Sequence, residues 1–115
     1  MFIDIGQWQI PIENSKEHKE LIRRFVKYQR ATRDEWPYKE AYFYMMVTED
    51  QSVESWKYID IFDNTDDFEK MEGTMNKVFE REPEVKAVFD RVFEIMVPDT
   101  WKTTQWTEVE EFRIE

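Results

Sequence analysis

The chain has 115 residues with 26 acidic and 16 basic side chains, a formal net charge of −10, and its length fits one domain with a single core. The absence of cysteine excludes disulfides, thiol nucleophiles and cysteine-based metal sites, and the acidity disfavours binding to nucleic acid. The first ten residues lack the basic region of a signal peptide, and no apolar run reaches the roughly 18 residues of a membrane span, so we expect a soluble, cytoplasmic protein without membrane contacts.

The first predicted strand covers residues 2–12. Successive side chains of a strand point to opposite faces, so Ile3 and Ile5 are expected on one face and Trp8 on the other. Gly6 is a candidate position for a bulge, which would shift this alternation.

An amphipathic helix is predicted for residues 14–36. Asn14 has the character of an N-cap residue, with a glutamate three residues later as in a capping box. Trp36 is expected to end the helix, because the residue before a proline disfavours the helical conformation. The segment 16–33 carries seven basic and two acidic residues, which predicts a basic helix face.

The next two strands, within residues 40–50 and 55–63, are predicted to form a hairpin with a long polar turn. Both strands are apolar on both faces, whereas an antiparallel sheet with one uncovered face usually alternates apolar with polar residues. The face expected to meet the helices carries Ile3, Ile5, Phe43, Met45, Val47, Ile59 and Ile61. The face expected to remain uncovered carries Trp8, Tyr42, Tyr44, Met46, Trp56, Tyr58 and Phe62.

Residues 64–99 are predicted to form two consecutive helices. Asn64 or Thr65 caps the first of them, and two aspartates in its first turn favour the helix dipole. Pro83 is expected at the first position of the second helix, where its missing N–H is not needed.

The last strand comes from "TWKTTQWTEVEEFRIE", in which Trp101 and Trp106 have opposite parity, so only one of them can face inward. The order β-α-β-β-α-β, with the second helix broken at Pro83, predicts a single α+β domain over residues 1–115. With right-handed crossovers it forms a ferredoxin-like four-stranded antiparallel sheet with its helices on one face. The uncovered face is too apolar for a monomer, so we expect a homodimer in which a second copy covers it.

Two segments resemble known domains. "WKYIDIFDNTDDFEKM" is similar to the strand-into-helix entry, and "REPEVKAVFDRVFEIM" to the proline-interrupted second helix, of the dimeric α/β-barrel superfamily that contains the antibiotic-biosynthesis-monooxygenase-like domains. The resemblance implies a homodimer whose two sheets form a barrel, with a pocket between sheet and helices in each protomer. Members include cofactor-independent oxygenases, haem-degrading enzymes, isomerases, dehalogenase-like proteins and ligand-binding modules.

The haem-degrading members of that superfamily bind iron through a histidine on the second helix. The only histidine here is His18, on the first helix, and the second helix offers Asn76 and Lys77 instead, which disfavours haem degradation. His18 and its neighbouring carboxylates also lack the ligand spacing of a metal site. We therefore expect neither a metal nor a cofactor.

Asp60 and His18 are the candidate catalytic residues. Asp60 is expected among the aromatic side chains of the uncovered face, where enclosure would raise its pKa and make it a general base. Asp4 lies on the matching face of the first strand, subject to the bulge at Gly6. In the alternative interpretation Asp60 pairs with a cation or a tyrosine across a dimer interface, and His18 is a solvated residue in a charged first turn.

Three functional hypotheses follow. In the first, a homodimeric α/β-barrel protein binds a small apolar or aromatic molecule and oxidises it without a cofactor, at a ligand site lined by Trp8, Tyr42, Tyr44, Trp56, Tyr58 and Phe62. In the second, these aromatic side chains fill the dimer core and the protein is a non-enzymatic dimerisation or ligand-sensing module. In the third, the basic face of the first helix docks an acidic partner protein.

Overall fold

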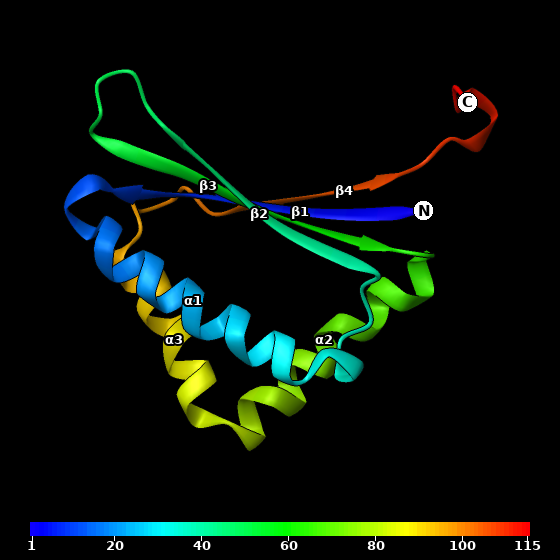
Figure 1. The fold of residues 1–115 in the computed structure, drawn as a ribbon, viewed down its shortest axis with the longest axis horizontal. Helices are drawn as coiled ribbons and strands as arrows, with labels where there is room; N and C mark the ends of the chain where they lie inside the picture. Colours follow the sequence, from blue (N-terminus) through cyan, green and yellow to red (C-terminus); the bar gives the residue numbers. More distant parts are fainter.

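The computed structural model describes residues 1–115 as one antiparallel sheet packed against three α-helices (Figure 1). The elements in chain order are β1 (Phe2–Pro11), α1 (Ser15–Ala31), β2 (Glu40–Val47), β3 (Val53–Phe62), α2 (Thr65–Arg81), α3 (Pro83–Ile95) and β4 (Lys102–Thr107). The strands lie in the order β2-β3-β1-β4, all neighbours are antiparallel, and the helices cover one face. This confirms the predicted ferredoxin-like α+β fold. None of the helices combines the length and the apolarity needed to cross a membrane.

Helix α1 begins where the sequence predicts but is held there by a different contact. Asn14 occupies the N-cap position, yet its side chain makes no capping hydrogen bond and instead donates through Nδ2 to the carbonyl oxygen of Ile95 at 3.1 Å. The amide therefore joins the start of α1 to the end of α3. The helix also ends at Ala31, before the expected Trp36, because the Thr32 hydroxyl bonds the Tyr28 carbonyl oxygen at 2.7 Å and a short 3-10 turn follows.

The second helical region follows the sequence closely. The Asn64 side chain accepts a hydrogen bond from the backbone N–H of Asp67 at 2.8 Å and so caps α2. Pro83 lies at the first position of α3, as predicted.

The assignment of faces in β1 and β3 was wrong. Gly6 lies opposite Tyr58 and Trp8 opposite Trp56 in a register that continues past Gly6 without a bulge. The residues of these strands that face the helices are Phe2, Asp4, Gly6, Trp8, Ile10, Glu54, Trp56, Tyr58, Asp60 and Phe62. Ile3, Ile5, Ile59 and Ile61 lie on the opposite face. The large rings fill the space between sheet and helices and bury more apolar area there than the isoleucines would, which decides which face turns inward.

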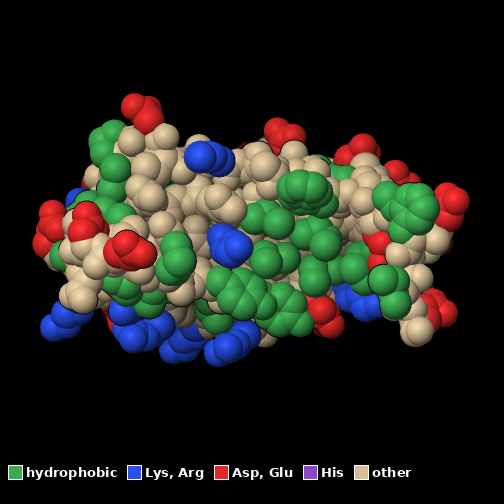
Figure 2. Space-filling model, turned by 90° about the horizontal axis from the view of Figure 1, so that it is seen from above, with side chains coloured by type: hydrophobic (Ala, Val, Ile, Leu, Met, Phe, Trp, Pro, Cys, Tyr) green, Lys and Arg blue, Asp and Glu red, His purple; other side chains and the backbone are tan.

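The prediction for β2 was right, since Phe43 pairs with Tyr58 and faces the helices while Tyr42 and Tyr44 face away. The outward surface, which we call the open face, carries a continuous apolar patch over the middle of the sheet (Figure 2). Its apolar members are Ile3, Ile5, Tyr42, Tyr44, Met46, Ile59, Ile61 and Trp106. Exposed fractions of 51% for Tyr44, 62% for Met46 and 59% for Trp106 show that nothing in the chain covers it.

Candidate functional site

A cavity of about 210 Å³ lies between the helix-covered face of the sheet and the three helices. It is almost entirely apolar, and its only lining residues without an apolar side chain are Gln29 and Asp60. The lining consists of Trp8, Ile22, Phe25, Gln29, Ala41, Phe43, Tyr58, Asp60, Met71, Met75, Val88, Phe89, Val92, Phe93 and Trp101. All three helices and three strands contribute, so the cavity belongs to the packing of the whole fold. Apolar cavities with few polar groups are the usual form of small-molecule sites.

Asp60 brings an ionisable group to this apolar lining. Its pKa is raised to about 7, mainly because burial disfavours the charged carboxylate and secondly because Asp4 lies directly opposite on β1. No hydrogen bond to the Asp60 carboxyl contributes to this shift. A carboxyl group with a pKa near neutrality can both accept and donate a proton under physiological conditions.

Asp4 and Tyr58 form a polar network beside Asp60. The Tyr58 hydroxyl donates to Oδ2 of Asp4 at 2.8 Å, and Nε2 of Gln105 donates to Oδ1 of the same carboxylate at 2.7 Å. Burial, followed by the charge of Asp4, raises the pKa of Tyr58 above its ordinary value, so the phenol keeps its proton. Asp4 and Tyr58 therefore satisfy one another, and Asp60 is the group of the three without a fixed partner.

Strand alternation predicts Asp60 and Tyr58 on one face, and they lie together there in the structure. The direction of Asp4 depends on whether β1 has a bulge at Gly6, and the continuous register at Gly6 points Asp4 towards the helices. Gln105 is not predicted from sequence, because it reaches Asp4 only through the pairing of β4 with β1. No local sequence signal announces a contact between residues 101 positions apart.

His18 lies outside the cavity lining and is fully buried, so its interpretation as a solvated residue was wrong. Its Nε2 accepts a hydrogen bond from the indole N–H of Trp8 at 3.0 Å, and its ring packs edge-on against Trp56. Burial lowers the pKa of His18 to about 4, so the imidazole is neutral. Nδ1 has no hydrogen-bond partner, and the neutral ring is held by packing and by Trp8.

The other predicted ligand residues separate into three groups. Trp8 and Tyr58 line the cavity. Trp56 and Phe62 face the helices outside its lining: the Trp56 indole donates to Oε1 of Glu54 at 3.0 Å, and Phe62 is fully buried. Tyr42 and Tyr44 lie on the open face, away from the cavity.

Trp101 and Trp106 point in opposite directions, as their parity requires. Trp101 lines the cavity and contacts Trp8, with ring centroids 5.7 Å apart, while Trp106 lies on the open face opposite Ile3. No group of three or more histidine, cysteine, aspartate or glutamate side chains is arranged to hold a metal ion.

Comparisons with known proteins establish the fold. No protein-family model matches the chain, and a comparison with curated proteins finds no match. Among solved structures, protein Atu4242 from Agrobacterium tumefaciens is similar over 96% of this chain and 95% of its own, with a TM-score of 0.63 and 10% identity. A de novo designed protein with a ferredoxin fold, LFR1 1, aligns over 100% of this chain and 94% of its own with a TM-score of 0.48 and 15% identity. The observed topology and the likeness to the Agrobacterium protein show a ferredoxin-like α+β fold.

Proposed function

We propose that this chain is a small-molecule-binding protein of the dimeric α/β-barrel type whose cavity holds a small apolar or aromatic molecule. The observation that carries the proposal is an apolar cavity with one unpartnered carboxyl group, that of Asp60. A volume of about 210 Å³ corresponds to roughly seven water molecules at about 30 Å³ each. This fits a single substituted ring better than a larger ligand.

Asp60 is the proton acceptor in the proposed reaction. A ligand with an acidic C–H or phenolic O–H group gives its proton to the Asp60 carboxylate, whose pKa of about 7 suits both uptake and release. The apolar lining excludes water and leaves the resulting anion without competing proton donors. The Tyr58 hydroxyl does not donate to the ligand, because its proton is already donated to Asp4.

The resemblance to monooxygenase-like domains supports a following step with dioxygen as co-reactant. The electron-rich phenolate reacts directly with dioxygen, so that the ring C–H position para to the phenolic oxygen becomes a carbonyl and the phenol becomes a quinone. One oxygen atom of dioxygen remains in the product, and the other leaves as water with the ring hydrogen and the phenolic hydrogen. The substrate supplies the electrons, which makes this chemistry compatible with a site built only from protein side chains.

The first test is a binding and turnover comparison with Asp60→Asn. Native mass spectrometry of the protein as purified from cells is expected to detect a bound small molecule, and single-ring phenols and quinols are expected to quench the fluorescence of the cavity tryptophans. Asp60→Asn is expected to keep ligand affinity within about threefold while oxygen consumption falls by about 100-fold or more, since general-base catalysis contributes factors of that order.

Asp66→Asn is the matched control, because it removes the same charge from an exposed position and is expected to leave both quantities unchanged. Ligand binding with no oxygen consumption, and no effect of Asp60→Asn on affinity, would favour the non-enzymatic ligand-sensing alternative. Absence of binding by every phenol and quinol, together with a ligand-free mass, would contradict the proposal.

The dimer in this proposal forms through the open face. Its apolar patch is one that monomeric proteins rarely leave in water, and packing it against a second copy removes it from solvent. Ile59 lies on the open face opposite Tyr42 and Ile5, so it is central to that surface.

Ile59→Asp is expected to weaken dimerisation by about 100-fold or more, because it buries an unpaired charge at the contact. Analytical ultracentrifugation at micromolar concentration measures this as a shift towards the monomer. Ile12→Asp, an equally apolar but exposed position outside the sheet faces, is the control and is expected to change nothing. A wild-type protein that sediments as a monomer would exclude the dimer.

A further inference from the structure

The open face contains a second concavity, and we infer that it receives the C-terminal segment, residues 108–115, of a second copy of this chain. The inference rests on the homodimer proposed above and names the residues of the two copies that contact each other. We call this concavity the lysine groove because Lys57 and Lys102 line it; its volume is about 530 Å³.

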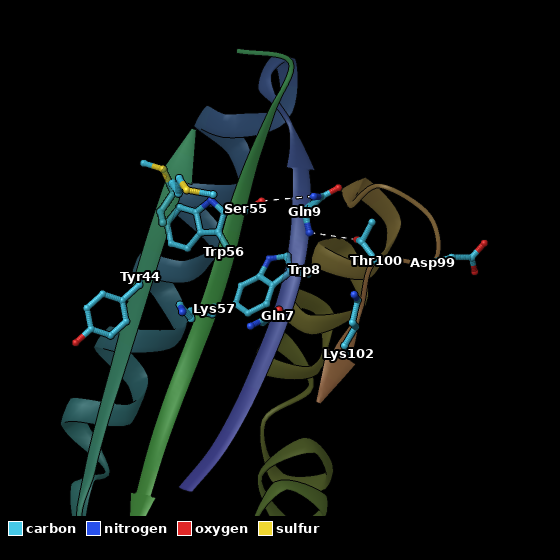
Figure 3. A pocket seen from close by; sticks show the side chains of 12 residues that line it. Gln7, Trp8, Gln9, Tyr44, Ser55, Trp56, Lys57, Asp99, Thr100 and Lys102 are labelled. Carbon is cyan, nitrogen blue, oxygen red and sulfur yellow. Dashed lines mark hydrogen bonds between the residues drawn. The ribbon is translucent and has the colours of Figure 1, made fainter. Parts of the chain in front are cut away.

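The lysine groove is lined by residues of all four strands (Figure 3). Gln7 of β1 is paired with Lys57 of β3 on one side and with Lys102 of β4 on the other, so the three side chains form a row on the same face. Tyr44 and Met46 of β2 supply an apolar wall. The groove therefore combines two cations with an apolar surface.

Neither lysine is neutralised within its own chain. The lysines that form ion pairs lie elsewhere in the fold, and Lys57 and Lys102 form none. The only acid that lines the groove is Asp99, whose side chain points away from both lysines (Figure 3). Glu40, the acid on the open face of β2, is bonded to the Tyr42 hydroxyl at the sheet edge. In a chain of net charge −10, this is an unpaired cationic site.

Covering the open face removes these lysines from water. A buried charge without a partner is costly, so the covering surface has to bring carboxylates to Lys57 and Lys102. The face of a second copy carries the same two lysines and cannot supply them. The carboxylates must come from another part of the second copy.

The C-terminal segment has the matching chemistry. Glu110 and Glu111 take part in no ion pair, and Phe112 and Ile114 are 74% and 98% exposed. The segment leaves the end of β4 and extends away from the helices (Figure 1). Arg113 pairs with Glu108 and Glu115, so Glu110 and Glu111 are the carboxylates left to meet the lysines, and the exposed Phe112 and Ile114 beside them fit the apolar wall.

Because of the direction of β4, the C-terminal segment cannot reach the lysine groove of its own chain in this conformation. The strand begins at Lys102, opposite Gln7, and ends at Thr107, opposite Phe2, so the segment starts roughly 17 Å from Lys102 and points away from it. If the two copies are related by a two-fold axis that reverses the strand direction, the C-terminal end of β4 in one copy lies over the lysine groove of the other.

The area of the open face supports the same occupant. Four strands about 4.8 Å apart and about eight residues long, at roughly 3.3 Å per residue, make a face of roughly 500 Å². A standard stable interface buries about 800 Å² on each partner. The exchanged segments supply additional contact area on both sides of the dimer.

The test is a zero-length carbodiimide cross-link, which joins a lysine amine to a carboxylate only when the two are in contact. Equal amounts of ¹⁴N- and ¹⁵N-labelled protein are mixed, allowed to exchange and cross-linked. Peptides joining Lys57 or Lys102 to Glu110, Glu111 or Glu115 are expected with mixed isotope labels. A dimer with cross-links elsewhere only, or with links at these positions that never carry mixed labels, overturns the inference and leaves the dimer intact. A monomer overturns both.

A charge exchange provides an independent measure. Lys57→Glu with Lys102→Glu is expected to raise the dimer dissociation constant at least about tenfold, and adding Glu110→Lys with Glu111→Lys is expected to restore it. Lys16→Glu with Lys77→Glu is the matched control, since it changes the net charge equally at exposed lysines without ion pairs. A groove variant that behaves like this control, or one that the second pair fails to rescue, counts against the inference.

Discussion

Replacing Gly6 with alanine is expected to destabilise the protein by about 3–5 kcal/mol, because the new methyl group would overlap the ring of Tyr58. A Cβ atom at Gly6 would lie 2.6 Å from Cζ of that ring and closer still to Cε2. The ring cannot turn aside easily, since it packs against Trp8 and Trp101 and its hydroxyl is bonded to Asp4. Relief of the clash therefore breaks the buried hydrogen bond or opens the sheet.

The other glycine of the chain is the control for this experiment. A Cβ atom at Gly73 meets nothing within 4 Å, and the residue lies in the interior of α2, so Gly73→Ala is expected to stabilise by about 0.5–1 kcal/mol. Urea unfolding at pH 7 compares the two substitutions with the wild type. Equal effects at both glycines would show that the Tyr58 ring does not lie over Gly6 as described.

The second expected result is a pair of opposite pH dependences at Asp60 and His18. In the unfolded state Asp60 loses its proton above its ordinary pKa of 3.8, whereas in the folded state it keeps the proton up to a pH of about 7. Stability from this group is therefore present at low pH and is lost as the pH rises towards about 7. Relative to Asp60→Asn, the wild type is expected to lose about 2–3 kcal/mol between pH 5 and pH 8.

His18 acts in the opposite direction. Its pKa of about 4 in the folded state lies below its ordinary 6.5, so the unfolded state takes up a proton first as the pH falls. Relative to His18→Gln, the wild type is expected to lose about 3 kcal/mol between pH 6.5 and pH 4. Glutamine is neutral and can still accept the Trp8 hydrogen bond, which confines the difference in slope to protonation.

Urea unfolding at half-unit pH intervals on the wild type and both variants separates the two groups. Subtracting each variant from the wild type isolates one titration, and the two difference curves are expected to slope in opposite directions. A flat difference for Asp60→Asn would mean that the Asp60 carboxyl is solvated in the folded protein and is unsuited to the proposed proton transfer.

Several local features of the fold are predictable from sequence because they depend on neighbouring residues. Asn64 caps α2 through a backbone N–H three residues later, and Pro83 begins α3 because a proline is tolerated only there. Asn14 has the same local character but bonds Ile95 across the fold, which explains why its predicted capping bond was wrong.

The candidate site also has features that neighbouring residues predict and features that depend on distant residues. Alternation along β3 places Tyr58 and Asp60 on one side, and the sequence alone predicts that grouping. The sequence does not tell whether that side meets the helices or the solvent, because side chains alternate in the same way whichever face of the strand is buried. The burial of His18 is also hidden from the sequence, since its charged neighbours indicate solvent while its ring meets Trp8 and Trp56 from two strands.

The sequence by itself determined the order of elements, the ferredoxin-like α+β fold and an apolar face that the chain's own helices leave uncovered. These features follow from short-range periodicity, caps and chain connectivity. Only the tertiary structure decided that the rings of Trp8, Tyr58 and Phe62 turn inward and that the isoleucines face out. It also decided that Gln105 reaches Asp4. The physical reason is that these choices depend on how side-chain volumes fill the space between sheet and helices, which is a property of residues distant in sequence.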